Sequence, residues 1–211
     1  MSTGAEAQPI VYVVDDDTSL RDALARLFRS VGLQAKTFAA ASEFLRDKLA
    51  DGPSCLVLDV RLPGLSGLDF QAELIKANID IPIVFMTGHG DIPMTVRAMK
   101  AGAIEFLPKP FRDQDMLDAV QIGLERDRDR RRSAGDTARL KANFATLTSR
   151  EQEIMGLVTT GLMNKQIAGQ IGVSEITVKV HRGSVMRKMG AKSLAELVRM
   201  ADALGIRRET A

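Results

Sequence analysis

Five residues able to bind a cation or a phosphoryl group stand at the ends of short apolar runs in the first half of the chain. They are Asp15, Asp16, Asp59, Thr87 and Lys109. Three carboxylates placed together repel one another and need a cation, and their hard oxygen ligands favour Mg²⁺. With a cation bound, a carboxylate can attack an activated phosphoryl group. A lysine can then neutralise charge on the phosphoryl oxygens, and a threonine hydroxyl can donate a hydrogen bond to one of them.

Each of these residues also has an ordinary structural explanation. Asp15 could form a turn, Thr87 could end a strand, and Lys109 could be a solvated surface charge. Asp59 comes shortly before a Pro-Gly pair at residues 63–64, so it could simply cap that turn. These separate explanations would all have to hold at once, for residues that stand at matching strand ends. We therefore expect the five residues to form one shared site.

Hydrophobic periodicity predicts the elements that must position these residues. Short apolar runs without polar alternation are typical of strands buried on both faces of a parallel sheet. Such runs, the second of them weak, occur at residues 10–14, 35–38, 56–59, 82–86 and 103–107. Helical spacing predicts helices near residues 18–31, with a cap at Thr18 or Ser19, and near residues 42–49, 67–77, 92–101 and 113–124. Five alternations of strand and helix predict a doubly wound parallel sheet, in which ligands bind at the carboxyl ends of the strands.

The charge distribution divides the chain in two. Residues 1–124 hold 12 Lys/Arg and 17 Asp/Glu, a net charge of −5, whereas residues 125–211 hold 17 and 10, a net charge of +7. An acidic half can hold a cation, and a basic half can meet a polyanion. The sequence has no apolar run of about eighteen residues, which argues against a membrane span. Its first residues show no signal-peptide pattern, so we expect a cytoplasmic protein.

Only helices are predicted in the second half. The charged run at residues 125–136 is interpreted as a solvated linker or as a frayed extension of the preceding helix. Further helices are expected from a cap at Thr148 or Ser149 to Gly161, and over residues 164–171, 175–189 and 194–204. The second and third of these form a helix-turn-helix pattern.

The longer helix of that pattern carries basic side chains. Lys179 and Arg182 are three residues apart and share a face, partly opposite Ile176 and Val180. Cations on one face of a capped helix can meet phosphates and base edges in the major groove of DNA. On charge alone, however, an ordinary solvated helix face is the simpler interpretation.

Residues 9–124 resemble the receiver domain of two-component response regulators. The matching motifs are Asp15-Asp16, Asp59 with Pro63-Gly64 after it, Thr87-Gly88 and Lys109-Pro110. Residues 87–91 and 98–103 resemble the FixJ-type branch in particular. The resemblance implies a flavodoxin-like (βα)5 fold with strand order 2-1-3-4-5. It also implies that Asp59 accepts a phosphoryl group from a phosphohistidine of a sensor histidine kinase.

The same resemblance assigns roles to individual residues. It implies that Mg²⁺ is held by Asp16, Asp59 and the backbone carbonyl of Arg61, with Asp15 helping through water. Phe106 occupies the position of the family's switch aromatic, although a plain core aromatic is an equally good interpretation. The receiver would catalyse only the transfer of a phosphoryl group to Asp59 and the hydrolysis of the resulting acyl phosphate. We therefore do not expect an enzyme that turns over a separate substrate.

Residues 146–205 resemble the LuxR-type helix-turn-helix domain, through residues 147–151, 161–168 and 173–181. The resemblance implies a four-helix DNA-binding domain whose third helix contacts bases and whose last helix dimerises. Gly183 occupies one of the positions used toward bases, offers no side chain there, and weakens the helix by up to about 1 kcal/mol relative to alanine. The expected DNA contacts are Ser174, Thr177, Lys179, Val180, Arg182, Gly183, Arg187 and Lys188.

These observations predict a response regulator with a receiver at residues 9–124, a linker at 125–145 and a DNA-binding domain at 146–205. Phosphorylation is expected to control dimerisation and binding to promoter DNA, with RNA polymerase as a further partner. Two other functions use the same residues. One is an Mg²⁺-dependent phosphatase or phosphotransferase acting on a small substrate, although no substrate-binding cap is evident. The other is a constitutive DNA-binding protein with a vestigial receiver, although the receiver motifs are complete.

Overall fold

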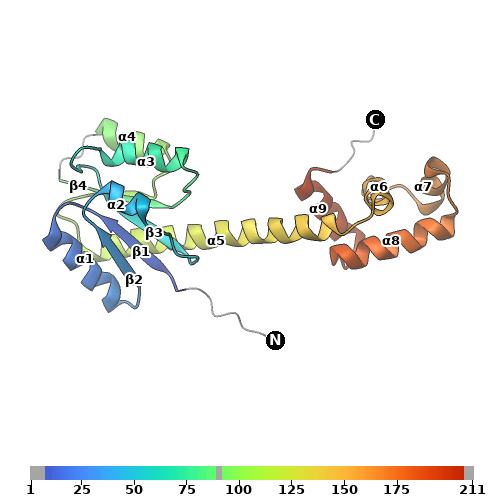
Figure 1. The fold of residues 1–211 in the computed structure, drawn as a ribbon, viewed down its shortest axis with the longest axis horizontal. Helices are drawn as coiled ribbons and strands as arrows, with labels where there is room; N and C mark the ends of the chain where they lie inside the picture. Colours follow the sequence, from blue (N-terminus) through green and yellow to red (C-terminus); the bar gives the residue numbers. More distant parts are fainter. Residues whose placement is uncertain (1–7, 89–91, 207–211) are drawn as a thin grey trace. The chain divides into compact units, whose positions relative to one another are not determined.

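The computed structural model describes residues 8–88 and 92–206. The chain forms two compact units, which divide between Arg131 and Arg132. The first unit is a five-stranded sheet with helices on both faces, and the second is helical (Figure 1). Across the described residues, no helix is both long enough and apolar enough to cross a membrane.

The sheet of the first unit has the order β2-β1-β3-β4-β5, which confirms the predicted flavodoxin-like topology. All neighbouring strands are parallel. Strands β1, β3 and β4 are buried along their whole length, as expected for strands covered on both faces. The edge strand β2 is more exposed, which explains its weak hydrophobic signal. The strands are β1 (Ile10–Val14), β2 (Gln34–Phe38), β3 (Ser54–Asp59), β4 (Ile83–Thr87) and β5 (Glu105–Pro108).

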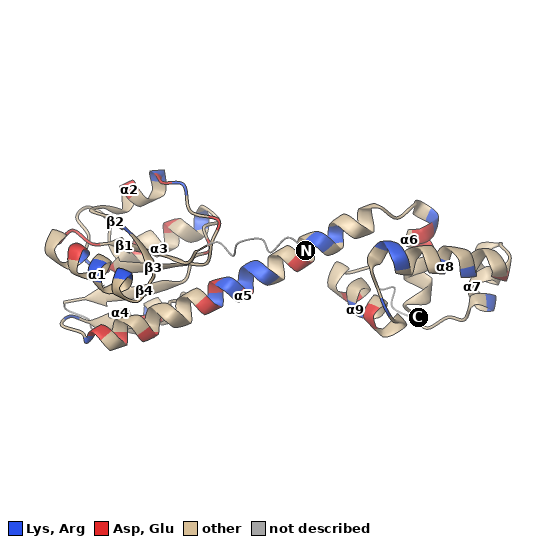
Figure 2. Ribbon diagram, turned by 90° about the horizontal axis from the view of Figure 1, so that it is seen from below, with Lys and Arg blue, Asp and Glu red and all other residues tan. Residues whose placement is uncertain are grey.

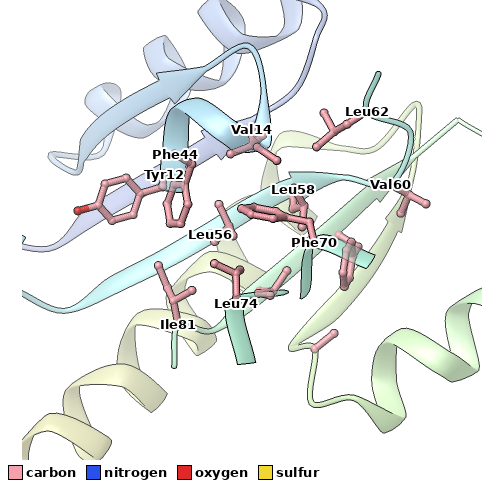
Figure 3. Packing of buried hydrophobic residues seen from close by; sticks show 14 of the residues in the cluster. Tyr12, Val14, Phe44, Leu56, Leu58, Val60, Leu62, Phe70, Leu74 and Ile81 are labelled. Carbon is pink, nitrogen blue, oxygen red and sulfur yellow. The ribbon is translucent and has the colours of Figure 1, made fainter. Parts of the chain in front are cut away.

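Two hydrophobic layers cover the sheet. Helices α1 (Thr18–Ser30) and α5 (Asp113–Ala145) pack on one face. Helices α2 (Ala41–Arg46), α3 (Gly67–Lys76) and α4 (Ile92–Lys100) pack on the other. Figure 3 shows the second layer, in which buried aromatic rings pack edge to face. Ring centroids lie 5.4 Å apart for Tyr12 and Phe44, and 5.9 Å apart for Phe44 and Phe70.

The predicted cap of α1 and the predicted end of α2 are wrong. The carboxylate of Asp17, not a hydroxyl of Thr18 or Ser19, caps α1 and accepts hydrogen bonds from the N–H groups of Ser19 (2.8 Å) and Leu20 (3.2 Å). A carboxylate at this position also complements the positive end of the helix dipole. Helix α2 ends three residues early, at Arg46.

Helix α5 is much longer than predicted. The core helix expected to end near residue 124 continues to Ala145, so of the two interpretations of the charged run the helix extension is confirmed and the linker is wrong. Asp127 forms ion pairs with Arg130 and Arg131, and Asp136 pairs with Arg139. Pairs of opposite charge three or four residues apart support this stretch of the helix, which lacks an apolar stripe.

The second unit contains α6 (Ser149–Val158), α7 (Asn164–Ile171), α8 (Glu175–Met189) and α9 (Leu194–Leu204). Leu140 and Phe144 from the end of α5 pack against their common core. Of the two predicted caps of α6 the structure uses Thr148, which forms a capping box with Glu151, and Ser174 caps α8. Helix α6 ends at Val158, short of the expected Gly161.

Candidate functional site

The strand register aligns the ends of the central strands. Val14 at the end of β1 pairs with Leu58 of β3, and Thr87 at the end of β4 pairs with Pro108 of β5. The structure thereby brings the five predicted receiver residues to one edge of the sheet, at or directly after these ends: Asp15, Asp16, Asp59, Thr87 and Lys109. The N–H of Lys109 donates to the carbonyl of Thr87 over 2.7 Å, which continues the β4–β5 pairing to this edge.

Three carboxylates and one ammonium group form the centre of the site. Asp15, Asp16 and Asp59 each place one oxygen within 4.8 Å of the others. The Nζ of Lys109 lies 2.7 Å from Oδ2 of Asp15 and 3.1 Å from Oδ2 of Asp59. Asp15 and Asp59 are buried and Asp16 is exposed. Three negative charges therefore face one positive charge, and a cation could neutralise the remainder.

Burial raises the pKa of Asp59, because it removes the charged carboxylate from water, and repulsion from Asp15 adds to this increase. The hydrogen bond and the charge of Lys109 lower the pKa of Asp59 without cancelling the increase. For Lys109, burial acts to lower the pKa, but hydrogen bonds and charge interactions with both carboxylates raise it overall. A cation beside Asp59 would favour the ionised form, which is the nucleophilic form.

Backbone contacts hold the acidic residues in place. The N–H of Asp17 donates to Oδ1 of Asp15 over 2.8 Å, and the N–H of Arg61 donates to Oδ1 of Asp59 over 3.3 Å. Arg61, whose carbonyl is the predicted metal ligand, therefore lies beside the cluster. Arg21 was not predicted; its Nη1 donates to the carbonyl of Asp15 over 2.6 Å. The only hint of this role in the sequence is the position of Arg21 in the first turn of α1, close after the acidic run.

Gly67, at the start of α3, is a second residue that sequence reasoning missed. A Cβ there would overlap the carbonyl oxygen of Asp59 and would lie 3.0 Å from Cα of Val60. The N–H of Gly67 donates to the carbonyl of Val60 over 2.8 Å. Because α3 packs directly against the backbone that carries Asp59, any side chain at Gly67 would displace the acidic site.

The predicted switch aromatic, Phe106, is buried on β5, with 9% of its surface exposed. Its ring centroid lies 6.2 Å from that of Phe85 on β4. This position suits both a switch and a core residue. The FixJ-like run at residues 87–91 falls partly outside the described residues, which exclude 89–91.

In the second unit, α8 has an exposed face that carries apolar as well as basic residues. Ile176 is 76% exposed and Val180 66% exposed; Lys179 is exposed as well, and Arg182 is half-buried. Buried positions on α8 belong to other residues: Val178, Val185 and Met189. The exposed residues of α8 are Glu175, Ile176, Lys179, Val180, Gly183 and Arg187. Cations and apolar groups together are suited to phosphates and base edges in a major groove.

Two of the predicted basic DNA contacts bond to residues outside α8. Nη1 of Arg182 donates to Oδ1 of Asn164 over 3.0 Å. Nζ of Lys188 donates to Oε2 of Glu151 over 2.6 Å and to the carbonyl of Thr146 over 3.2 Å. Their charges are therefore partly used in holding α8 against its neighbours.

The remaining predicted DNA contacts lie at the two ends of α8. The N–H of Thr177 donates to Oγ of Ser174 over 3.1 Å, and their hydroxyl oxygens lie 2.8 Å apart. These two residues thus form the amino-terminal cap. Arg187 is exposed, and its Nη2 donates to Oγ of Ser184 over 3.4 Å.

A receiver-like sheet with an acidic edge, joined to a helix-turn-helix unit, defines a class of signalling protein. Residues 11–121 match the response regulator receiver domain, and residues 145–201 match the luxR family of bacterial regulatory proteins. The chain therefore belongs to the two-component response regulators that carry a LuxR-type DNA-binding domain. Its relatives are FixJ-type regulators.

Individual relatives match nearly the whole chain. Nodulation protein W of Bradyrhizobium diazoefficiens is 61% identical over 204 residues, which cover 97% of this chain and 90% of that protein. The transcriptional regulatory protein FixJ of Azorhizobium caulinodans is 41% identical and covers 93% of both chains. Among solved structures, the response regulator StyR is 52% identical with a TM-score of 0.85, covering 93% of this chain and 99% of that one. Full-length FixJ from B. japonicum is 39% identical with a TM-score of 0.55, covering 94% and 98%.

Proposed function

We propose that this response regulator accepts a phosphoryl group from a sensor histidine kinase on the carboxylate of Asp59. The observation that carries the proposal is the position of Asp59 at the open edge of the sheet, 3.1 Å from the ammonium of Lys109. An oxygen of Asp59 attacks the phosphorus of the kinase phosphohistidine. The P–N bond breaks, its electron pair leaves with the imidazole nitrogen, and an acyl phosphate forms on Asp59.

Asp16, Asp59 and the backbone carbonyl of Arg61 would hold Mg²⁺, with Asp15 helping through water. Oxygens that share one Mg²⁺ are at most about 4.2 Å apart, because each bond is about 2.1 Å long. The carboxylate oxygens lie within 4.8 Å of one another, so a small contraction is sufficient. When bound, the ion supplies positive charge against the phosphoryl oxygens.

Lys109 and Thr87 complete the catalytic group. After transfer, the ammonium of Lys109 pairs with a phosphoryl oxygen, and the hydroxyl of Thr87 donates to another. The same groups stabilise the charge that develops when water later hydrolyses the acyl phosphate. The receiver in this proposal promotes both reactions on itself and turns over no separate substrate.

The phosphoryl group adds about −1.5 to −2 charge at neutral pH. That charge draws Thr87 and Lys109 toward it and biases the surface near Phe106 between two states. Receiver dimerisation, release of the DNA-binding domain, or both follow. A dimer then binds a promoter of roughly two-fold symmetry and contacts RNA polymerase. We place the receiver at residues 9–124 and the DNA-binding domain at 146–205.

In the DNA complex, the exposed face of α8 enters the major groove. Lys179, Val180 and Gly183 lie toward bases, and the other predicted contacts lie toward phosphates: Ser174, Thr177, Arg182, Arg187 and Lys188. Support comes from the exposure of Lys179, Val180 and Gly183 together on one helix face.

Treatment with acetyl phosphate and Mg²⁺ tests the acceptor. Intact-mass spectrometry of the wild-type chain should show one added phosphoryl group, and Asp59→Asn should show none. Asp51→Asn is the matched control, because Asp51 is an exposed carboxylate outside the cluster. Labelling of Asp59→Asn to the wild-type level would contradict the proposal.

A DNA-binding assay separates the proposal from the other two functions. The full chain is incubated with a library of random duplex DNA, with and without acetyl phosphate, and bound sequences are recovered. Tighter binding after phosphorylation supports a switched regulator. Equal binding in both states would indicate a constitutive DNA-binding protein. Steady Mg²⁺-dependent phosphate release from small phosphoesters would indicate a phosphatase.

A further inference from the structure

A fully buried carboxylate lies on α5 and has no part in the acidic cluster. Oδ2 of Asp127 accepts hydrogen bonds from the N–H (2.9 Å) and hydroxyl (3.3 Å) of Ser54, and from Nε of Arg131 (2.7 Å). Oδ1 accepts hydrogen bonds from Nε (3.0 Å) and Nη2 (2.6 Å) of Arg130. Five donors thus compensate a buried charge that would be costly without them.

These contacts fasten α5 to the amino-terminal side of the sheet. Ser54 is the first residue of β3, the strand whose last residue is Asp59. Arg131 also donates to the carbonyl of Ala50, over 3.5 Å, in the segment before β3. Nε of Arg130 lies 3.6 Å from Asp80, which precedes β4. One carboxylate therefore organises contacts between α5 and the starts of two strands.

Asp127 lies where hydrophobic contact between α5 and the sheet has ended. Leu124 is the last residue of α5 in the receiver core, and the packing of α5 resumes at Leu140, in the second unit. Within the described chain, residues 125–139 contribute to neither core. Figure 2 shows this stretch of α5 as bands of basic and acidic residues. Polar contacts alone therefore hold α5 at residues 127–131.

We propose that Asp127 is a positioning residue that couples the phosphorylation site to the connecting part of α5. Strand β3 has six residues and carries Asp59 at one end and the N–H bound by Asp127 at the other. Strand β3 is continuous and pairs with β1 and β4, so in this coupling a displacement of the backbone at Asp59 passes along β3 to Asp127 and the helix beyond it. The inference rests on the proposed phosphorylation of Asp59.

Hydrogen–deuterium exchange of the full chain tests this role, with Mg²⁺ and with or without acetyl phosphate. Asp127→Asn keeps an oxygen for the N–H of Ser54 but loses the charge that holds Arg130 and Arg131. We expect residues 125–131 to exchange roughly tenfold faster in this variant. We also expect phosphorylation to change exchange at residues 132–145 in the wild type, but not in the variant. Asp129→Asn, an exposed carboxylate two residues away, should match the wild type.

Intact-mass measurement of phosphoryl labelling keeps the two hypotheses apart. If the wild type is not labelled, the proposed function fails, whatever Asp127 does. If Asp127→Asn is labelled normally and residues 132–145 still respond as in the wild type, the coupling role is overturned. It is overturned as well if a labelled wild type shows no response there. If Asp127→Asn does not fold, Arg131→Gln replaces it, because this variant retains the contacts between Asp127 and Ser54. A wild-type change in exchange at residues 132–145 of Arg131→Gln also overturns the role.

Discussion

Lys109 is held between two carboxylates before any phosphoryl group arrives, 2.7 Å from Asp15 and 3.1 Å from Asp59. Burial acts to lower the pKa of Lys109, but both carboxylates together raise it, so the group is charged at neutral pH. A positive charge fixed beforehand costs no reorganisation when negative charge develops beside it. The resting contacts of Lys109 thus prepare it for the proposed reaction.

Lys109→Ala should slow the phosphorylation of Asp59 by acetyl phosphate on the order of 100-fold, the typical effect of removing one preorganised donor. The rate is measured by intact-mass spectrometry at fixed Mg²⁺. Lys100→Ala is the control, since Lys100 is exposed on α4, and its rate should be that of the wild type. Equal rates for both variants would remove Lys109 from the catalytic group.

Glu151 in the second unit supports a pH prediction. Hydrogen bonds from Lys188, Ser184 and the Thr148 N–H lower its pKa from 4.5 to about 2. Because the folded pKa lies below the unfolded one, the ionised carboxylate stabilises the fold above pH 4.5, and this stability is lost as pH falls toward 2. Glu151→Gln should therefore melt below the wild type at pH 7.

The difference in melting temperature between wild type and Glu151→Gln should shrink as pH falls from about 4.5 to about 2. Circular dichroism of the full chain at a series of pH values measures it. Glu153→Gln is the control, because Glu153 is a more exposed carboxylate paired with Arg150. A difference that stayed constant over this range would mean that Glu151 does not titrate as described.

At the scale of elements, α5 approaches the sheet closely at Gly123. A Cβ there would lie 2.6 Å from Sγ of Cys55 and 3.6 Å from Cβ of Pro82. Cys55 is fully buried on β3, and burial raises the pKa of its thiol far above the usual range. Cys55 therefore serves as a small apolar residue against which the helix packs. Its thiol is inert and is not a nucleophile.

Gly123→Ala should destabilise the receiver by about 1–3 kcal/mol, the usual cost of overpacking. In the background of Cys55→Ala, which removes Sγ, the same substitution should cost less than about 1 kcal/mol. Urea unfolding of the four chains measures this coupling. Additive free energies would show that the sulfur does not limit the distance between helix and strand.

The local sequence pattern was sufficient to predict most helices and strands, and to predict the sheet edge that carries the acidic cluster. The fully buried run of β3 and the cap at Ser174 are visible in neighbouring residues, and parallel topology then brings Lys109 to Asp15 across 94 positions. The end of α5 was not predictable in this way. Its continuation includes Asp127, whose partner Ser54 is 73 residues away, and a buried ionic contact leaves no periodic signal.

The exposed face of α8 followed from the family resemblance and not from hydrophobic pattern. Apolar side chains usually mark the buried face of a helix, so pattern alone would turn Ile176 and Val180 inward. In the structure both are exposed, as a DNA contact at Val180 requires, while Lys188 of the same helix pairs with Glu151 of α6. A helix suited to binding a partner can expose apolar groups, so its pattern alone does not assign its faces.

At the scale of the whole molecule, the two units have separate hydrophobic cores, and the acidic cluster belongs entirely to the first. Calorimetry of the full chain should show two unfolding transitions. Mg²⁺ at 100 times its dissociation constant should stabilise the receiver transition by about 2.7 kcal/mol and leave the other unchanged.

Asp16→Asn should largely remove the Mg²⁺ effect, because Asp16 supplies one of the proposed ligands. Asp22→Asn, an exposed carboxylate on α1 outside the cluster, should retain it. The metal assignment fails if Asp16→Asn keeps the full stabilisation or if both transitions shift together.

Gly183 lies on the exposed face of α8, and a Cβ there would meet no atom within 4 Å. Alanine would therefore suit the isolated protein and raise helix stability by up to about 1 kcal/mol. In the proposed complex, that empty volume faces the groove and sets how deeply the helix inserts. Gly183→Ala should melt at a higher temperature yet bind duplex DNA more weakly in fluorescence anisotropy. A variant that gained in both measurements would show that insertion depth is set elsewhere on the helix.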